Sequence, residues 1–288
     1  MSDVTDPILD LLEEVEAYAA TALEQEFDRN WLRSLRQQAA FGYRRLDLEL
    51  AELKPRARLL EIGGGPFLLA MLLAARGFSV HVLEPKGTGF EQLYRIQDMV
   101  LSFCAHKGIQ FEVIDQKVEE FSSNDRFDLA YSVNVFEHLD DIEKALSSVV
   151  AVLSNNGVLR ILCANYSFPY EPHFGVPIVV NKKTTQALFS SRIDKKETAK
   201  RSPGLWQSLN FISVPMLRRL CAQHGWNVDF DRSATVDILK RFQFDESLRQ
   251  RHAPLAPLVD LALKVGIGRV ISALPSATQP YLDARIIR

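Results

Sequence analysis

The stretch from Arg58 to Pro85 constrains the fold of this chain more than any other segment. An apolar run enters three consecutive glycines, Gly63 to Gly65, a helix-like apolar segment follows, and a second β-type run ends at Glu84. Strand, glycine turn, helix, strand and acid is the order of a nucleotide-binding βαβ unit. Glu84 follows the turn by about 20 residues, the usual separation between such a turn and an acid that binds ribose hydroxyls.

Strands and helices continue to alternate after this unit. Further β-type runs lie at Phe111 to Ile114, Asp128 to Val133, Val158 to Cys163 and Trp226 to Phe230. Such alternation predicts a parallel sheet that is covered by helices on both faces. We therefore expect an α/β protein with a Rossmann-like, doubly wound and mostly parallel sheet. Helical patterns at the two ends of the chain predict an N-terminal helical extension and a C-terminal helical tail.

These patterns divide the chain into a helical extension (1–55), a core (56–242) and a C-terminal extension (243–288). Within the core, residues 164–210 interrupt the alternation with four prolines, several aromatic residues and a charged run at 192–201. A long irregular insertion in a compact domain is usually functional or partly disordered. We expect this insertion to be irregular and to lie on the substrate side, with its charged run facing solvent.

The composition excludes several classes of protein. A formal net charge of −2 over 288 residues argues against nucleic acid as a partner. No uncharged apolar run is long enough to cross a membrane, and the acidic N-terminal segment lacks the pattern of a signal peptide. The three cysteines are far apart and show no ligand spacing, so we expect reduced, mostly buried thiols and no metal site. A cytoplasmic location is the default expectation.

The segment between Pro257 and Pro275 repeats apolar residues on roughly one helical face, but charged residues interrupt it. We expect this face to pack against the core or against a sister subunit, so the chain is expected to be a monomer or a homodimer. A less favoured alternative is peripheral contact with a membrane surface, without stable insertion.

The glycine turn does not fit a dinucleotide site, because Leu68 stands where the dinucleotide fingerprint has its third glycine. The run from Glu61 to Phe67 instead resembles motif I of class I S-adenosylmethionine-dependent methyltransferases. The resemblance continues through Glu84, through the loop from Asp115 to Glu120, and through Phe127 to Leu139, which reads FDLAYSVNVFEHL. It covers about Arg58 to Phe230.

This resemblance implies S-adenosylmethionine as cofactor, S-adenosylhomocysteine as product and a small molecule as methyl acceptor. It assigns Glu84 to the ribose, Glu61 to the methionine end, and the third-strand loop to the adenine. The cofactor-binding residues expected on this basis are Glu61, Gly63, Gly64, Gly65, Glu84, Val118, Glu119 and Asn134. Each also has a plainer interpretation: the glycines could serve only as a strand-to-helix turn, and Glu61 could only brace it.

A general base is needed only where the acceptor must lose a proton, as a hydroxyl must. The candidates follow the fourth and fifth strands, because ligands of open α/β sheets bind at the carboxyl edge. We expect an oxygen nucleophile with His173 as the preferred base and His138 as a second candidate, since imidazole exchanges protons near neutral pH. Alternatively, His173 and Glu171 only fix their loop, and His138 is a satisfied helix-start residue.

Two rival functions follow from the same residues. One is an NAD(P)-dependent oxidoreductase on the same kind of sheet, which Leu68 and the FD to EH segment disfavour. The other is a non-catalytic relative that keeps the cofactor pocket and acts as a binding or scaffold subunit. The intact glycine turn and Glu84 do not exclude this second alternative.

Overall fold

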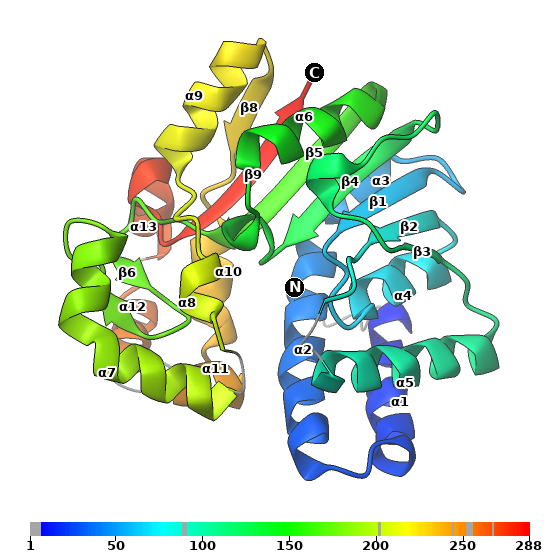
Figure 1. The fold of residues 1–288 in the computed structure, drawn as a ribbon, viewed down its shortest axis with the longest axis horizontal. Coiled ribbons are helices and arrows are strands. Elements are labelled where there is room, and N and C mark those ends of the chain that lie inside the picture. The colour runs from blue at the N-terminus through cyan, green and yellow to red at the C-terminus, as the bar shows by residue number, and fades with distance from the viewer. Residues whose placement is uncertain (1–6, 88–90, 201–202, 244, 252–255, 267) are drawn as a thin grey trace. The chain divides into compact units, whose positions relative to one another are not determined.

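The structure of the chain is a computed structural model that describes residues 7–87, 91–200, 203–243, 245–251, 256–266 and 268–288 (Figure 1). Within these residues, seven strands form one sheet. Their order is β3 (Glu112–Ile114), β2 (Ser79–Leu83), β1 (Arg58–Ile62), β4 (Phe127–Val133), β5 (Leu153–Ala164), β9 (Tyr281–Ile287) and β8 (Asn227–Phe230). A separate antiparallel pair joins β6 (Tyr170–Glu171) to β7 (Val176–Pro177).

The chain divides into two compact units. The first, unit 1, contains residues 1–132 and 148–158, and the second, unit 2, contains residues 133–147 and 159–288. Unit 1 holds the helices α1 (Pro7–Ala22), α2 (Glu26–Arg45), α3 (Asp47–Glu52), α4 (Leu68–Ala75) and α5 (Glu91–Lys107), and the 3₁₀ turn η1 (Val118–Glu120). Helix α6 (Ile142–Val152) and strand β5 contribute to both units.

The parallel strands of unit 1 bring their carboxyl ends to one edge. Strand β1 pairs in parallel with β2 and with β4, and Ile62 lies opposite Leu83. Strand β2 also pairs in parallel with β3. Leu59 and Leu60 have no exposed surface, as expected for a parallel strand that is covered on both faces. The residues that follow Ile62 and Leu83 therefore meet at the same edge.

The N-terminal helices are part of the packing of unit 1. Helices α1 and α2 pack against α4 and α5, and α1 runs beside α2 in Figure 1. A bidentate ion pair links α2 to α5: the guanidinium of Arg95 donates to both carboxylate oxygens of Asp28 at 2.8 and 3.1 Å. Asp28 is almost fully buried, so loss of Arg95 would leave a buried charge without its partner.

Unit 2 begins at Val133, the last residue of β4, and its first helical element is the 3₁₀ turn η2 (Phe136–His138). Among the described residues, unit 2 also contains the helices α7 (Lys182–Lys200), α8 (Leu205–Ser208), α9 (Val214–His224), α10 (Ala234–Arg241), α11 (Glu246–Arg251), α12 (Ala256–Lys264), α13 (Gly268–Ala273) and the turn η4 (Ser276–Thr278). Helix α9 begins at a Ser213 cap, whose side chain accepts from the N–H of Met216, and it ends at Gly225 in the left-handed region.

The expected fold class is confirmed: the sheet is mostly parallel and has helices on both sides. Helices precede the first strand, and helices α11 to α13 lie near the C-terminus, but the last element of the chain is strand β9 of the sheet. The expected irregularity of residues 164–210 is wrong for much of that segment. Helix α7 occupies residues 182–200 and holds most of the charged run, while Arg201 lies outside the described residues. The prolines of the insertion all lie outside α7, whose Lys, Glu, Ala and Gln residues are good helix formers.

The sheet also contains a strand that the sequence patterns did not predict. Strand β9 pairs antiparallel with β8, with Val228 opposite Ile286. In unit 2, Asp283 of β9 is buried and forms an ion pair with Arg160 of β5 at 2.6 Å. Among the described residues, no helix is both long and apolar enough to cross a membrane.

Candidate active site

The backbone conformation and tight packing of the glycine turn after β1 suit only residues without a bulky side chain. Gly63 and Gly65 have positive φ angles of 72° and 47°. A Cβ on Gly64 would lie 2.2 Å from Cγ1 of Val82, so the turn has no room for a side chain there. The N–H of Gly63 donates to the carbonyl of Leu83 at 2.8 Å, which anchors the turn to the end of β2.

The carboxylate of Glu84 lies against this turn. Its Oε2 accepts a hydrogen bond from the N–H of Gly65 at 3.0 Å. Burial raises the pKa of Glu84 to about 7, although hydrogen bonds from the backbone of Gly65 and Gly64 act in the opposite direction. An acid in this position can exchange its backbone donor for the hydroxyls of a ribose.

Glu61 is buried below the start of α4. Burial raises its pKa well above the ordinary value, even though the hydroxyl of Tyr131 donates to its Oε2 at 3.2 Å. The charge of Glu84 raises the pKa further, and a backbone hydrogen bond from Ala70 lowers it. These contacts fit the bracing role of Glu61 as well as a role toward the methionine end of a cofactor.

The other expected cofactor residues lie in two places. Val118 and Glu119 belong to η1 in unit 1 and are both buried, and the backbone carbonyl of Glu119 accepts from the hydroxyl of Ser148 at 3.3 Å. Asn134 belongs to unit 2, has a φ of 58°, and its Oδ1 accepts from the hydroxyl of Tyr281 at 3.0 Å.

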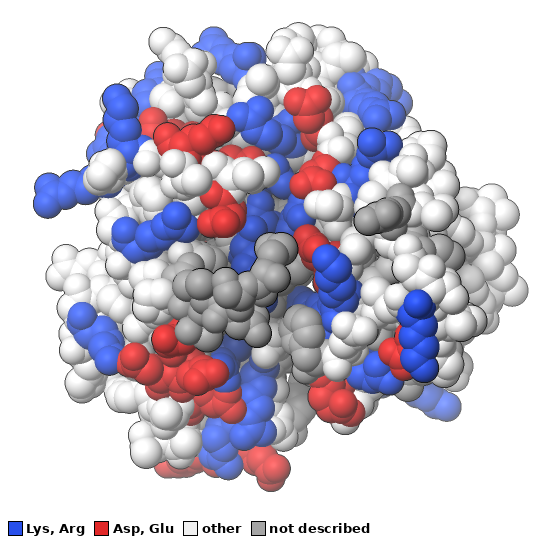
Figure 2. Space-filling model, turned by 180° about the vertical axis from the view of Figure 1, so that it is seen from behind, with Lys and Arg blue, Asp and Glu red and all other residues white. Residues whose placement is uncertain are grey.

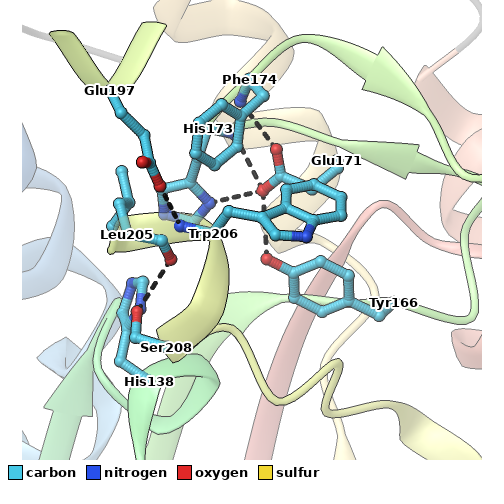
Figure 3. A network of polar contacts seen from close by, with 9 residues as sticks. All are labelled: His138, Tyr166, Glu171, His173, Phe174, Glu197, Leu205, Trp206 and Ser208. Carbon is cyan, nitrogen blue, oxygen red and sulfur yellow. Dashed lines mark hydrogen bonds and ion pairs between the residues drawn. The ribbon is translucent and has the colours of Figure 1, made fainter. Parts of the chain in front are cut away.

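The preferred base, His173, is held by a buried carboxylate (Figure 3). Nδ1 of His173 lies 2.6 Å from Oε1 of Glu171, which has no exposed surface. The same carboxylate accepts from the backbone N–H groups of His173 and Phe174 and from the hydroxyl of Tyr166, at 3.0, 2.7 and 3.2 Å.

These donors keep Glu171 ionised. Burial pushes the pKa of Glu171 upward, but the hydrogen bond and charge of His173 and the two backbone N–H groups outweigh it, so the pKa lies below the ordinary value. An ionised carboxylate at Nδ1 favours the tautomer that carries its proton there. Nε2 is then the basic nitrogen of the neutral His173 ring.

His138 lies next to His173, with ring centroids 5.2 Å apart and planes at 77°. Its Nδ1 lies 2.9 Å from the hydroxyl oxygen of Ser208. Asn210 fixes the η2 turn, because its side-chain amide donates to the carbonyls of Phe136 and Leu139 at 2.7 and 2.9 Å. The structure therefore brings together both predicted bases, which are 35 positions apart in the sequence.

Glu137 is the third member of this cluster and is 1% exposed. Its Oε2 is buried and has no hydrogen-bond partner. Burial raises the pKa of Glu137 to about 7, while the charge of His173 lowers it. One potential ligand atom each from Glu137, His138 and His173 lies within 4.8 Å of the others.

Three contributing residues were not among the expected site residues. Nε2 of Gln97, on α5, donates to the carbonyl of Gly65 at 2.6 Å and so holds the glycine turn from the helix side. Ser208 positions His138, and Glu137 completes the histidine cluster. Glu137 was visible in the FD to EH motif, whereas nothing in the sequence around Gln97 or Ser208 marks them.

On the face drawn in Figure 2, the surface of the described residues carries charges of both signs, which gives no sign of a strongly charged partner. Basic and acidic side chains of the described residues are interspersed across that view. This agrees with the formal net charge of −2. Long tracts of nucleic-acid backbone are bound by concentrated basic surfaces instead.

Comparison with known proteins places the chain in a family. Residues 31–229 match the model of a family described as methyltransferase domain. An uncharacterised protein of Mycobacterium tuberculosis is 34% identical over 269 residues, which are 93% of this chain and 86% of that protein. A ubiquinone biosynthesis O-methyltransferase of Rickettsia canadensis is 24% identical over 110 residues, which are 38% of this chain and 44% of that enzyme.

Among solved structures, one similar fold is that of a Galdieria sulphuraria protein whose assignment as a sarcosine dimethylglycine methyltransferase is provisional. It has a TM-score of 0.50 and 17% identity, and the match covers 98% of this chain and 97% of that protein. The family match spans the glycine turn, Glu84 and the FD to EH segment. The chain therefore belongs to the methyltransferase-domain family, as a class I methyltransferase that depends on S-adenosylmethionine.

Proposed function

We propose that this methyltransferase transfers the methyl group of S-adenosylmethionine to a hydroxyl oxygen of a small-molecule acceptor, with His173 as the proton acceptor. The observation that carries the proposal is the 2.6 Å contact between Nδ1 of His173 and the fully buried Glu171. A buried, ionised carboxylate orients the ring and stabilises the imidazolium that forms when Nε2 takes a proton. N-methylation of a neutral amine would not need a base during bond formation.

The cofactor is proposed to bind at the edge that follows β1 and β2. The glycines Gly63, Gly64 and Gly65 allow close approach of the backbone, and Glu84 accepts hydrogen bonds from the ribose hydroxyls. We assign Val118 and Glu119 to the adenine loop. Glu61 is assigned to the methionine part of the cofactor, and Asn134 is proposed as a further cofactor-binding residue without a more specific role. These roles follow the family pattern, and the burial of Glu61, Val118 and Glu119 is compatible with them.

The chemical step is an in-line displacement. When bound, S-adenosylmethionine would supply an activated methyl group, so that the new oxygen–carbon bond would form as the carbon–sulfur bond breaks and S-adenosylhomocysteine leaves as a neutral thioether. The acceptor's proton passes to Nε2 of His173 and then to solvent. The chain's own contribution is to align the oxygen with the methyl carbon and to take this proton.

Labelled S-adenosylmethionine and a panel of hydroxylated small molecules test the proposal. His173→Ala should lower turnover by about 10²–10⁴-fold, the usual contribution of a general base, while binding of S-adenosylhomocysteine stays within a factor of two or so. His224→Ala is the matched control, because His224 forms a similar pair with Glu143 at 2.7 Å on the exposed surface. Near-normal turnover of His173→Ala would remove His173 from the mechanism.

The scaffold alternative gives a different result in the same assay. A non-catalytic relative would bind S-adenosylhomocysteine but transfer no label in a single turnover with any acceptor. An acceptor that is methylated on nitrogen or carbon would retain the methyltransferase activity and contradict the proposed oxygen nucleophile.

A further inference from the structure

We propose that Glu137, His138 and His173 together bind one divalent transition-metal ion, with Zn²⁺ as the reference ion. All three residues belong to unit 2. One carboxylate oxygen or ring nitrogen from each lies within 4.8 Å of the others. Two imidazoles and one carboxylate form a donor set that suits transition metals such as zinc and iron rather than magnesium or calcium.

Glu137 supplies the first independent observation. Its side chain is 1% exposed, and its Oε2 has no hydrogen-bond partner in the structure. A buried polar atom without a hydrogen-bond partner normally lowers the stability of the fold by about 1–3 kcal/mol, and by more when it is charged. Such an atom in a folded protein therefore indicates an unassigned role. A cation held between this oxygen and two imidazoles would satisfy it.

The ring contacts of the two histidines supply the second observation. Nδ1 of His173 is occupied by the carboxylate of Glu171 at 2.6 Å, and Nδ1 of His138 is occupied by the hydroxyl of Ser208 at 2.9 Å. Histidines that bind metals usually have an outer partner of this kind on the nitrogen that does not bind the ion. On both rings, Nε2 is therefore the nitrogen assigned to the metal.

The geometry requires only a small closure. Two ligand atoms at about 2.0–2.1 Å from a tetrahedral zinc ion lie about 3.4 Å apart. The separation of up to 4.8 Å in the cluster then needs side-chain shifts of about an ångström. The 5.2 Å distance between the ring centroids of His138 and His173 shows that the rings already lie side by side.

An ion with three protein ligands keeps at least one open position, as catalytic zinc sites do. This part of the inference rests on the hydroxyl acceptor of the proposed function and replaces His173 as its base: an acceptor hydroxyl bound at the open position would lose its proton more readily, because a cation stabilises the oxyanion. In the metal-loaded protein, His173 would then be a ligand and the acceptor's proton would pass to solvent. Binding of the metal itself does not depend on turnover.

Metal binding is measured with the full chain, Zn²⁺ alone and no cofactor or acceptor. Isothermal titration should give one ion per chain, and Co²⁺ should give the visible absorption of a low-symmetry, four- or five-coordinate site. His138→Ala and Glu137→Gln should each weaken binding by about 100-fold or more. Ser208→Ala, which changes only an outer partner, should weaken it by about 10-fold. His224→Ala, a surface histidine next to Glu143, should leave it unchanged.

Equal affinity in the wild type, Ser208→Ala and His138→Ala would overturn the metal site, as would loss of binding in His224→Ala. Circular dichroism and thermal melting show whether the Glu137→Gln and His138→Ala chains are folded. If either of these variants is unfolded, the Zn²⁺ affinity of Ser208→Ala alone decides whether the metal site exists, because Ser208 lies outside the cluster. Tight, cluster-dependent Zn²⁺ binding with no methylation of any hydroxylated acceptor would retain the metal site and reject the proposed function. Full turnover of metal-stripped protein with no Zn²⁺ binding would reject the metal site and retain the proposed function.

Discussion

Oε2 of Glu84, at the end of β2, accepts a hydrogen bond at 3.0 Å from the backbone N–H of Gly65, in the turn after β1. The acid that we assign to the ribose and the turn that we assign to the cofactor are thus in direct contact. Burial raises the pKa of this carboxyl to about 7. If Glu84 binds the ribose as proposed, cofactor binding competes with protonation of Glu84 close to neutral pH.

We expect affinity for S-adenosylhomocysteine to fall as the pH drops below about 7. In the proposed role, the ionised carboxylate would accept hydrogen bonds from both ribose hydroxyls, so the ligand would select the deprotonated form. Below the pKa of the ligand-free protein, affinity should fall by up to about tenfold per pH unit until the pKa of the complex is reached. Calorimetric titrations at a series of pH values test this. Glu84→Gln should bind more weakly than the wild type near pH 8 and show a flat profile.

The same carboxyl should influence the stability of the ligand-free protein. Its folded pKa of about 7 lies above the ordinary 4.5, so the folded state holds this proton more tightly than the unfolded state. The penalty of burying the charge is absent below about pH 4.5, grows as the pH rises to about 7, and then stays constant. Relative to the wild type, Glu84→Gln should therefore gain on the order of 1–3 kcal/mol in its free energy of unfolding between pH 5 and pH 8. An identical pH dependence in both proteins would contradict a raised pKa.

Gly64→Ala should abolish cofactor binding and destabilise unit 1. The added Cβ would lie 2.2 Å from Cγ1 of Val82 and 3.0 Å from Cδ1 of Phe67, and neither side chain has open space behind it because both are buried. Overpacking of this kind costs about 1–3 kcal/mol or more. The double variant Gly64→Ala with Val82→Ala removes the nearest atom and should recover part of the lost stability. Thermal melting and titration with S-adenosylhomocysteine measure both effects, and a Gly64→Ala protein with wild-type values would refute the steric argument.

The edge of the sheet in unit 1 could be predicted because its signals are local. Glycines between an apolar strand and an apolar helix, followed by an acid after the next strand, are tied to one geometry by backbone sterics. Strand β9 escaped prediction for the opposite reason. Its Asp283 and Arg285 read as surface residues, and only the ion pair with Arg160, far away in the sequence, explains why Asp283 is buried.

In the histidine cluster, too, some features have a local sequence signal and others depend on contacts between distant residues. Glu137 and His138 belong to a recognisable motif, and His173 stood out as a titratable residue in an aromatic loop. Their proximity depends on the β6–β7 pair and on the Asn210 contacts to η2, neither of which has a sequence signal. The outer partners Glu171 and Ser208 each contact Nδ1 of one ring, and these contacts follow only from the three-dimensional structure.

Glu171→Gln should destabilise the fold and stop turnover together. The carboxylate accepts hydrogen bonds from His173, Phe174 and Tyr166. The side-chain amide of Gln would place an NH₂ group, which is a donor, against some of these donors. A buried hydrogen-bond donor that loses its acceptor costs about 1–3 kcal/mol. Glu143→Gln is the matched control, because its pair with His224 is exposed and should be worth less than about 1 kcal/mol. Chemical denaturation of both variants separates the cases, and equal losses would argue against a special role of the buried pair.

Asp283→Asn should show that the last strand is an integral part of unit 2. Asp283 is 1% exposed and lies 2.6 Å from the guanidinium of Arg160, which is itself 4% exposed. Removing one charge leaves the other buried and poorly compensated, at a cost of about 3–5 kcal/mol in the free energy of unfolding. Asp229→Asn, on the neighbouring strand β8, changes an exposed aspartate and should shift stability by no more than about 0.5 kcal/mol. Urea unfolding of the two variants gives the comparison. If Asp283→Asn were as stable as Asp229→Asn, the ion pair between β5 and β9 would not hold the strand in place, and packing of Leu282, Ala284 and Ile286 would have to do so alone.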